Sequence, residues 1–496
     1  MEEHEIKILA ERLIPPPQSV RFDDGAEFRL ADGCRFVLRV AERDGVREKA
    51  ERLCRRYWGV DAAVTVETAE DQTARQVDAY SVAVDAEKAV VTARGKTGVH
   101  NAFKTLRQLA EAERGGARLS GYFIVPCAID DAPALEFRGI HLCIFPETPI
   151  WDIEKQLRLA AYHKFNYAVI ECWGIFPFES HPEMCWRDRK LDRDALEMLI
   201  ELAGELGITL IPQLNVLGHA TGSRVITGKH FVLDLDPSLQ VLFEPAGWSW
   251  CLSNPETRKL LTELTEELHD FFGRPKFFHI GCDEAYDLAS CRDCRRRELK
   301  ELVRDHILWF HQRFAERGAR LIMWHDMLVG KGDERWKGYT ANARPGRSLD
   351  ELYKELPRDI VIADWQYGCP ASPDGAEPTW PTVRFFAEQK FDVLVCPWLN
   401  NDGTVSLGKL AAAEKLKGML ATAWHISHDR KFYNIYGVAA SAAWNPEATL
   451  PLLVGRRLTV AHHLRQIGWD MGVDRYEQTG CSQHQVDPGS HPHELT

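Results

Sequence analysis

Several features that mark particular classes of protein are missing from this sequence of 496 residues. It contains no run of about 18 apolar residues, so we predict no membrane-spanning helix. The segment Met1–Lys7 is acidic and has no apolar core, and we therefore expect no secretory signal peptide. Positive charge is in the minority, because 61 Lys and Arg residues stand against 73 Asp and Glu residues. The resulting net charge of −12 argues against nucleic acid or an anionic membrane as a partner.

The motifs of common cofactor and metal sites are missing as well. No glycine-rich phosphate loop follows any predicted strand, which disfavours a nucleotide-binding fold. The chain has 19 histidines, but His141 is followed by Leu142 and Cys143 instead of a histidine at H-x-H spacing. No predicted helix carries the H-E-x-x-H motif of a zinc hydrolase. We therefore predict a protein without a metal ion or another cofactor.

The Cys291-x-x-Cys294 pair is one half of a common zinc-site pattern. A second C-x-x-C or H-x3-H pair does not follow within reach, so we interpret these residues as ordinary reduced thiols, with a structural zinc site as the alternative. The 13 cysteines are scattered and lie mostly in apolar stretches. Without an expected signal peptide, this distribution favours reduced thiols in a cytoplasmic protein. The sequence leaves open whether the chains associate into a homo-oligomer.

The chain is too long for one ordinary hydrophobic core, so we expect two domains. Residues 1–132 predict a small α+β domain without evident catalytic residues, ending at the turn-like segment Asp130–Pro133. Its expected strands are Glu27–Leu30, Arg35–Val40, Ala63–Glu67, Ala79–Val84, Ala89–Ala93 and Tyr122–Ile129, and its expected helices are Val46–Trp58 and Gly98–Glu113.

Residues 133–470 show a repeated alternation of an apolar strand with a helix. Eight such units predict a (β/α)8 TIM barrel, and a doubly wound sheet is the alternative that the missing phosphate loop disfavours. The fold class is thus α/β, a barrel preceded by a small α+β domain. We expect the polar tail at 471–496 to be disordered. The predicted barrel strands are Phe137–Ile144, Ala168–Cys172, Thr209–Leu214, Phe277–Gly281, Leu321–Trp324, Ile360–Ala363, Val393–Val395 and Met419–Thr422.

Two consecutive carboxylates, Asp283 and Glu284, follow the fourth of these strands. In a regular strand they would point to opposite faces, but Gly281 permits a bend that lets both reach one ligand. Two close carboxylates repel each other, so we expect the pKa of one to be raised toward neutrality. An acidic pair that caps a helix N-terminus is the alternative interpretation.

In a TIM barrel the residues that perform chemistry lie at the carboxyl ends of the strands. The residues that we place there are acidic, aromatic or amide-bearing, with one arginine, which suits a neutral polyhydroxylated ligand better than a phosphate or a metal. The predicted catalytic residues are Asp283 and Glu284, and the predicted binding residues are Arg138, Glu171, His219, Trp324, Asp326, Trp365, Trp398 and Trp424.

The segment His279–Glu284 resembles the H-x-G-x-D-E signature of glycoside hydrolase family 20, the β-N-acetylhexosaminidases. Further segments are similar to that family in the same order along the barrel. They are Phe137–Gly139, Ile211–His219, Trp324–Leu328, Asp364–Trp365 and Ala423–Trp424. Within the family, the Gly-Cys-Asp-Glu form, the segment Ile170–Phe178 and the non-acidic Gln213 and Asn215 resemble the hexosaminidase D branch.

The resemblance implies an exo-acting, retaining enzyme that uses the acetamido group of its own substrate as the nucleophile. It implies that Glu284 is the general acid and base and that Asp283 orients the acetamido group. It also implies that Arg138 binds hydroxyls at the non-reducing end, and that Trp324, Trp365 and Trp424 enclose the acetamido methyl. The expected partner is an amino-sugar glycoside or oligosaccharide.

Departures from the family pattern leave alternatives open. The seventh-strand tyrosine beside the acetamido group, the third-strand acids and the eighth-strand Trp-x-Glu are missing, since Ile426 stands at the last of these positions. A glycan-binding barrel without catalysis and a glycosidase of the same fold with another sugar preference are therefore the alternatives. A metal-dependent barrel hydrolase is a weaker one. The choice between GlcNAc and GalNAc stays open, with the hexosaminidase D resemblance favouring galactosaminides.

Overall fold

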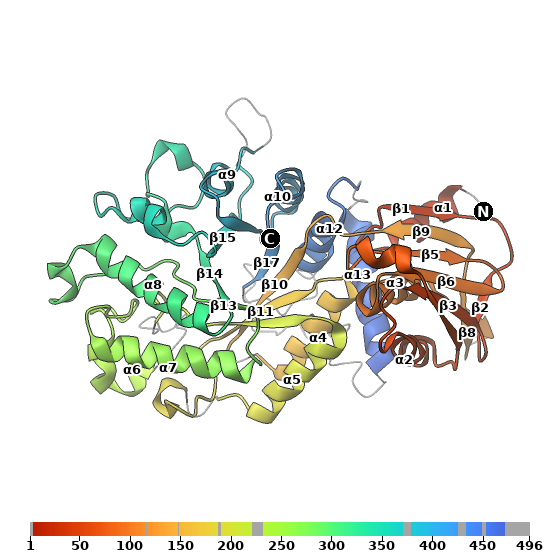
Figure 1. The fold of residues 1–496 in the computed structure, drawn as a ribbon, viewed down its shortest axis with the longest axis horizontal. Helices are drawn as coiled ribbons and strands as arrows, with labels where there is room; N and C mark the ends of the chain where they lie inside the picture. Colours follow the sequence, from red (N-terminus) through yellow and green to blue (C-terminus); the bar gives the residue numbers. More distant parts are fainter. Residues whose placement is uncertain are drawn as a thin grey trace. The chain divides into compact units, whose positions relative to one another are not determined.

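The computed structural model describes residues 3–115, 118–146, 148–186, 190–220, 232–370, 378–424, 433–448 and 453–471 (Figure 1). These residues form two compact units. The first contains the chain up to Glu136, residues 158–164 and the described residues after 428, and the second contains most of the residues between. None of the helices in these ranges combines the length and the apolar character that a membrane crossing requires. The tail at 471–496 lies, apart from Met471, outside the described residues.

The first unit contains two β-sheets. The larger has the strand order β1-β9-β5-β6-β3-β4, and the smaller has the order β2-β8-β7. Helix α3 packs on β5 and β6 and against α2, with its apolar face in the core. The strands are β1 Ser19–Phe22, β2 Phe28–Leu30, β3 Arg35–Val40, β4 Ala63–Thr68, β5 Tyr80–Val84, β6 Lys88–Ala93, β7 Glu111–Gly115, β8 Arg118–Ile124 and β9 Cys127–Asp131, and the helices are α1 Glu3–Glu11, α2 Val46–Trp58, α3 Lys96–Leu109, α12 Ala439–Trp444 and α13 Leu453–Met471.

Two predictions for this unit need correction. The helix predicted to reach Glu113 ends at Leu109, because the following residues leave the helix and pair with β8 as strand β7. The single strand predicted at Tyr122–Ile129 is two strands, β8 and β9, which belong to different sheets. Pro126 lies at the break and lacks the N–H that a continuous ladder needs.

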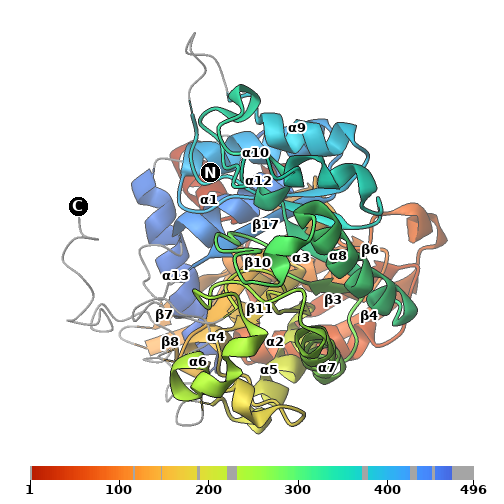
Figure 2. The same cartoon turned by 90° about the vertical axis from the view of Figure 1, so that its left-hand side faces the viewer.

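The second unit is a closed barrel of eight parallel strands, which confirms the predicted fold class. Consecutive strands pair in register, and the last pairs with the first, with Phe137 opposite Gly418. Helices α8, α9 and α10 pack against the strands from outside, as Figure 2 shows. The strands are β10 Phe137–Ile144, β11 Tyr167–Cys172, β12 Thr209–Gln213, β13 Phe277–His279, β14 Arg320–Trp324, β15 Val361–Trp365, β16 Asp392–Cys396 and β17 Gly418–Ala423. The helices are α4 Ile150–Tyr162 (which ends in the first unit), α5 Arg193–Leu206, α6 Val232–Leu235, α7 Pro255–Phe271, α8 Leu299–Glu316, α9 Pro381–Glu388 and α10 Asn401–Ala413.

The barrel interior is filled by apolar side chains, with at least one from every strand. Phe137 and Tyr167 stack there with ring centroids 4.2 Å apart. Because neighbouring residues of a strand point to opposite faces, this layer fixes which positions of each strand face inward. Polar caps begin several of the outer helices: the Asp192, Asn254 and Asn400 side chains accept backbone N–H groups at the starts of α5, α7 and α10.

Candidate active site

The carboxylate pair lies just beyond β13, where the backbone leaves the extended conformation. Gly281, Cys282 and Glu284 have φ values of 66°, 72° and 49°, in the left-handed region. This turn removes the alternation of a strand, so both carboxylates face the same imidazole nitrogen. His219 Nε2 lies 3.2 Å from Asp283 Oδ2 and 3.2 Å from Glu284 Oε2. The two acidic groups therefore converge, as the bend at Gly281 predicted.

Asn215, just after β12, holds this turn in place. Its side chain donates from Nδ2 to Asp283 Oδ1, and its Oδ1 accepts from the Cys282 amide at 3.1 Å and the Leu217 amide at 3.2 Å. A Cβ on Gly281 would lie 2.5 Å from Asn215 Cγ, so only glycine allows the two segments to approach this closely. Asp283 is 5% exposed and is therefore held in one position.

Glu284 is the more accessible member of the pair, with 29% of its side chain exposed. Its Oε1 accepts a hydrogen bond of 2.8 Å from the Tyr286 hydroxyl. Its backbone carbonyl accepts from Trp248 Nε1 at 2.6 Å, and its amide donates to Asp326 Oδ2 at 3.0 Å. The backbone is thus anchored on both sides while the carboxylate remains open to a ligand.

Asp326, just after β14, is one of two buried carboxyl groups in the described barrel whose pKa burial raises, the other being Asp364. Asp326 is fully buried, and burial together with the nearby negative charge of Asp283 raises its pKa to about 6. Asn342 Nδ2 donates to its Oδ2 at 2.8 Å, and Trp365 Nε1 donates to its Oδ1 at 3.3 Å. Repulsion between close carboxylates therefore acts here between Asp283 and Asp326.

This raised pKa predicts how stability depends on pH. The folded chain favours the protonated Asp326, so its stabilising contribution is complete below pH 3.8 and is lost as the pH rises through about 6. A shift of about 2 units corresponds to roughly 3 kcal/mol. Asn cannot ionise, so the unfolding free energy of Asp326→Asn should not show this loss. We expect the difference in unfolding free energy, variant minus parent, to increase by roughly 3 kcal/mol between pH 4 and pH 7. Urea unfolding followed by tryptophan fluorescence measures the difference, and parallel pH curves for the two proteins would contradict the prediction.

Three of the predicted tryptophans contact one tyrosine that the sequence analysis did not single out. Tyr367, two residues beyond β15, accepts a hydrogen bond from Trp424 Nε1 at 2.5 Å. Its ring centroid lies 5.1 Å from that of Trp365 and 5.3 Å from that of Trp398. Trp324 continues the group, with its ring centroid 6.1 Å from that of Trp424. Together they form an aromatic wall at the carboxyl ends of β14 to β17.

Glu171, near the end of β11, is buried on the opposite side of the barrel mouth. Its Oε2 accepts from Trp173 Nε1 at 3.1 Å and lies 3.5 Å from His141 Nε2. The His141 ring lies 4.4 Å from the Trp424 ring, and the Trp173 ring lies 6.3 Å from the His219 ring. Glu171 is thus connected to both the aromatic wall and the carboxylate pair.

Arg138 does not lie at the carboxyl end of its strand, where the sequence analysis placed it, and its role in binding sugar hydroxyls stays a prediction. It is the second residue of β10, which continues for six further residues to Ile144. At about 3.3 Å per residue, its Cα lies about 20 Å from the strand's carboxyl end.

Two further residues at the site come from loops that sequence patterns do not position. Trp248 packs on His219 with ring centroids 4.4 Å apart, and it stacks on Tyr286 at 6.3 Å. Tyr286 lies two residues after Glu284, and this closeness in the sequence could have identified it as a residue of the site. For Trp248, in the long connection between β12 and β13, no such signal exists.

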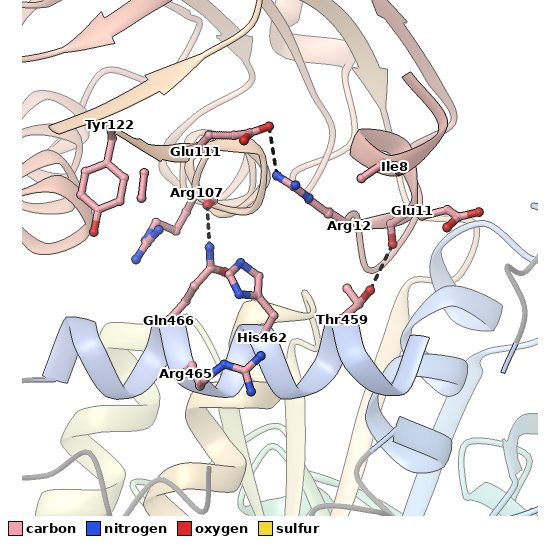
Figure 3. A pocket seen from close by; sticks show the side chains of 12 residues that line it. Ile8, Glu11, Arg12, Arg107, Glu111, Tyr122, Thr459, His462, Arg465 and Gln466 are labelled. Carbon is pink, nitrogen blue, oxygen red and sulfur yellow. Dashed lines mark hydrogen bonds and ion pairs between the residues drawn. The ribbon is translucent and has the colours of Figure 1, made fainter. Parts of the chain in front are cut away.

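A cavity of about 660 Å³ in the first unit is a separate feature (Figure 3). Three of its charged groups have partners: Arg12 pairs with Glu111 at 3.1 Å, and Arg107 lies over the Tyr122 ring at 5.3 Å. Gln466 donates to the Arg107 carbonyl at 3.4 Å. All of its lining residues belong to the first unit, so the cavity does not include the carboxylate pair.

Two family models match this chain. Residues 10–131 match the model for glycosyl hydrolase family 20, domain 2, and residues 184–371 match the model for the glycosyl hydrolase family 20 catalytic domain. Together the matches cover more than half of the chain. They include β12 to β15 and the carboxylate pair.

Named relatives are similar over part of the chain. A beta-hexosaminidase from Vibrio furnissii is 25% identical over 364 residues, which cover 64% of this chain and 57% of that protein. Hexosaminidase D from Bos taurus is 23% identical over 214 residues, which cover 41% of this chain and 54% of that protein. This chain therefore spans little more than half the length of the curated relatives it matches.

A solved structure shares the fold. The family 20 exo beta-N-acetylglucosaminidase from Vibrio harveyi, in complex with N-acetylglucosamine, superposes with a TM-score of 0.68 at 16% identity. The match covers 94% of this chain and 78% of that one. At 16% identity this comparison shows that the two proteins share a fold.

Proposed function

This chain belongs to glycoside hydrolase family 20, and we propose that it is an exo-acting, retaining β-N-acetylhexosaminidase. Its substrates would be β-glycosides with a terminal, non-reducing GlcNAc or GalNAc. The observation that carries the proposal is the convergence of Asp283 and Glu284, each 3.2 Å from His219 Nε2 and only Glu284 substantially exposed. One carboxylate is thus fixed for orienting a ligand, and the other is accessible for proton transfer.

In the first step, the acetamido carbonyl oxygen of the substrate attacks the anomeric carbon. Glu284 donates its proton to the glycosidic oxygen as the bond between that oxygen and the anomeric carbon breaks. The products are the free aglycone and an oxazolinium-type intermediate. In the second step, Glu284 removes a proton from water, and the water oxygen attacks the anomeric carbon. The bond between that carbon and the acetamido oxygen breaks, which opens the oxazolinium ring and restores the acetamido group. Two displacements at one carbon give net retention of configuration.

Asp283 supports both steps through position and charge. As a buried carboxylate it would accept the acetamido N–H and face the positive charge that develops on the ring. The bond from Asn215 Nδ2 and the contact with His219 fix it before the substrate arrives. Because the carboxylate is already in position, it does not have to move when the positive charge forms.

Tyr367 is proposed to take the place of the missing seventh-strand tyrosine beside the acetamido group. It stands among Trp365, Trp398 and Trp424, within the aromatic wall that would enclose the acetamido methyl. Replacing Tyr367 by Phe keeps the ring and removes the hydroxyl. We expect kcat to fall by roughly 10- to 100-fold with a smaller change in KM, because a hydroxyl that binds the attacking oxygen acts mainly in the transition state. Tyr353→Phe, in the short 3-10 helix Leu349–Glu355 before β15, is the matched control, and equal kinetics for both variants would exclude the role.

The proposed activity is tested with a pair of fluorogenic substrates, the β-aryl glycosides of GlcNAc and GalNAc. Turnover of either supports the hydrolase, and the ratio of the two kcat/KM values gives the sugar preference, for which the hexosaminidase D resemblance favours GalNAc. A purified chain that binds such sugars but releases no fluorophore would instead be a glycan-binding barrel. No step of the proposed mechanism passes through a metal ion.

A further inference from the structure

Four potential metal ligands meet beside the catalytic loops, although they come from separate parts of the sequence. The donor atoms of Glu244, Cys251, Cys291 and Cys294 all lie within 4.8 Å of one another. Cys251 Sγ is 3.7 Å from Cys291 Sγ and 3.7 Å from Cys294 Sγ. The sequence predicted ordinary thiols because no second pair follows Cys294, whereas the structure supplies the missing partners from the connection between β12 and β13.

A short hairpin brings the first two donors together. Phe243 and Trp250 form an antiparallel bridge, the Glu244 amide donates to the Ser249 carbonyl at 2.8 Å, and the Cys251 amide donates to the Leu242 carbonyl at 2.9 Å. In this register Glu244 lies opposite Ser249 and Cys251 lies opposite Leu242, so Glu244 and Cys251 are on the same face of the hairpin. The other two donors lie on the loop that follows the carboxylate pair.

The sulfur positions agree with a tetrahedral ion. Zinc–sulfur bonds of about 2.3 Å at tetrahedral angles separate the sulfurs by about 3.8 Å. The Cys294 amide lies 3.2 Å from Cys291 Sγ and donates to it. A backbone N–H aimed at a sulfur stabilises the thiolate that a metal requires, and the two-residue spacing lets one loop wrap a single ion.

The charge of Glu244 points to a cation at the same place. Its side chain is 0% exposed, and Oε2 accepts from the Cys291 amide at 2.5 Å and the Ser290 hydroxyl at 3.3 Å. Its Oε1 has no hydrogen-bond partner, and no Lys, Arg or His of the described chain forms an ion pair with it. Burying a carboxylate in this way is costly unless a positive charge compensates it.

We propose that Glu244, Cys251, Cys291 and Cys294 bind a structural zinc ion. Three thiolates and one carboxylate suit zinc better than calcium or magnesium, which prefer oxygen ligands alone. Four protein ligands leave no open position for water or substrate, so the ion has no part in hydrolysis. It would instead tie the hairpin to the loop after β13.

This link would stabilise the loops around the general acid. Trp248 lies within the hairpin and donates to the Glu284 carbonyl, and Tyr286 lies on the other loop and donates to the Glu284 carboxylate. The two rings stack on each other. An ion that joins the bases of both loops holds these contacts together without touching the substrate.

The full-length protein, purified under reducing conditions without added chelator, provides the test. We expect elemental analysis to find about one zinc per chain, and cobalt-substituted protein to show the thiolate charge-transfer bands and the intense visible bands of a tetrahedral site. A Cys291→Ser/Cys294→Ser variant should retain less than about a tenth of the zinc. Cys34→Ser, which removes a half-buried thiol in the first unit, is the matched control and should retain all of it.

Stability gives a second readout, independent of any enzyme activity. A strong zinc chelator should lower the Tm of the parent by roughly 5 °C or more and leave the Tm of the double-serine variant unchanged. Metal-free protein without cobalt–thiolate bands would overturn the proposal. A disulfide between Cys251 and either partner in the purified protein, or zinc retained by the double variant, would overturn it as well.

Discussion

Replacing Glu284 by Gln is expected to lower turnover about 10²- to 10⁴-fold on glycosides whose leaving group is a sugar or an alkyl alcohol. The loss on activated aryl glycosides should be below about tenfold, because their leaving oxygen departs without a proton. Gln keeps the size of the side chain and can still accept the Tyr286 hydroxyl, which donates at 2.8 Å in the parent. The variant therefore removes proton transfer with little change in shape.

The measurement is kcat/KM across a series of β-aryl glycosides with leaving groups of increasing pKa. The parent should show a shallow dependence and Glu284→Gln a steep one. Glu256→Gln, at an exposed position in the first turn of α7, controls for loss of a negative charge and should behave like the parent. Equal losses on good and poor leaving groups would show that Glu284 is not the proton donor.

Asp283→Asn should lower kcat on 2-acetamido glycosides by about 10²- to 10³-fold while KM changes less. The amide has the shape of the carboxylate but loses the negative charge that would face the oxazolinium-type intermediate. It also presents an N–H group where the acetamido N–H needs an acceptor. Because Asp283 is nearly buried between Asn215 and His219, a change of shape would disturb the fold, and the isosteric variant avoids this.

Thermal unfolding and tryptophan fluorescence should be nearly the same for Asp283→Asn and the parent, so that the kinetic effect can be assigned to charge. Asp402→Asn, at an exposed position in the first turn of α10, is the matched control. Unimpaired turnover of acetamido sugars by Asp283→Asn would exclude the orienting role.

The barrel was predictable from sequence because its parallel strands are buried on both faces and appear as continuous apolar runs. Such runs locate a strand better than they locate its ends. The strand containing Arg138 extends to Ile144, so the arginine lies near its beginning instead of at the mouth. In the first unit, the strand predicted through Pro126 is interrupted there, since proline has no N–H for the sheet ladder.

The core of the site was predictable for a related reason: carboxyl ends of neighbouring parallel strands meet at one end of a barrel. This rule brings Asp283, Glu284 and His219 together, and the left-handed turn at Cys282 and Glu284 completes their convergence. It says nothing of residues within long connections. Trp248 reaches Glu284 through a hairpin whose pairing depends on tertiary contacts.

The cluster of three cysteines and Glu244 shows the same limit. Cys251 and Cys291 are separated by a whole helix and strand, so spacing along the sequence cannot identify them as partners. The C-x-x-C pair was visible, and the two remaining ligands were not. Local patterns therefore showed two of the four proposed ligands, and the sequence analysis interpreted those two as ordinary reduced thiols.

The central claim is that the acetamido oxygen of the substrate, rather than a carboxylate of the protein, attacks the anomeric carbon. The most direct measurement compares kcat for aryl glycosides in which the acetyl group carries zero, one, two or three fluorine atoms. Fluorine withdraws electrons from the carbonyl, so this account predicts that kcat falls steeply with each added atom. A kcat that stays constant along the series would contradict it.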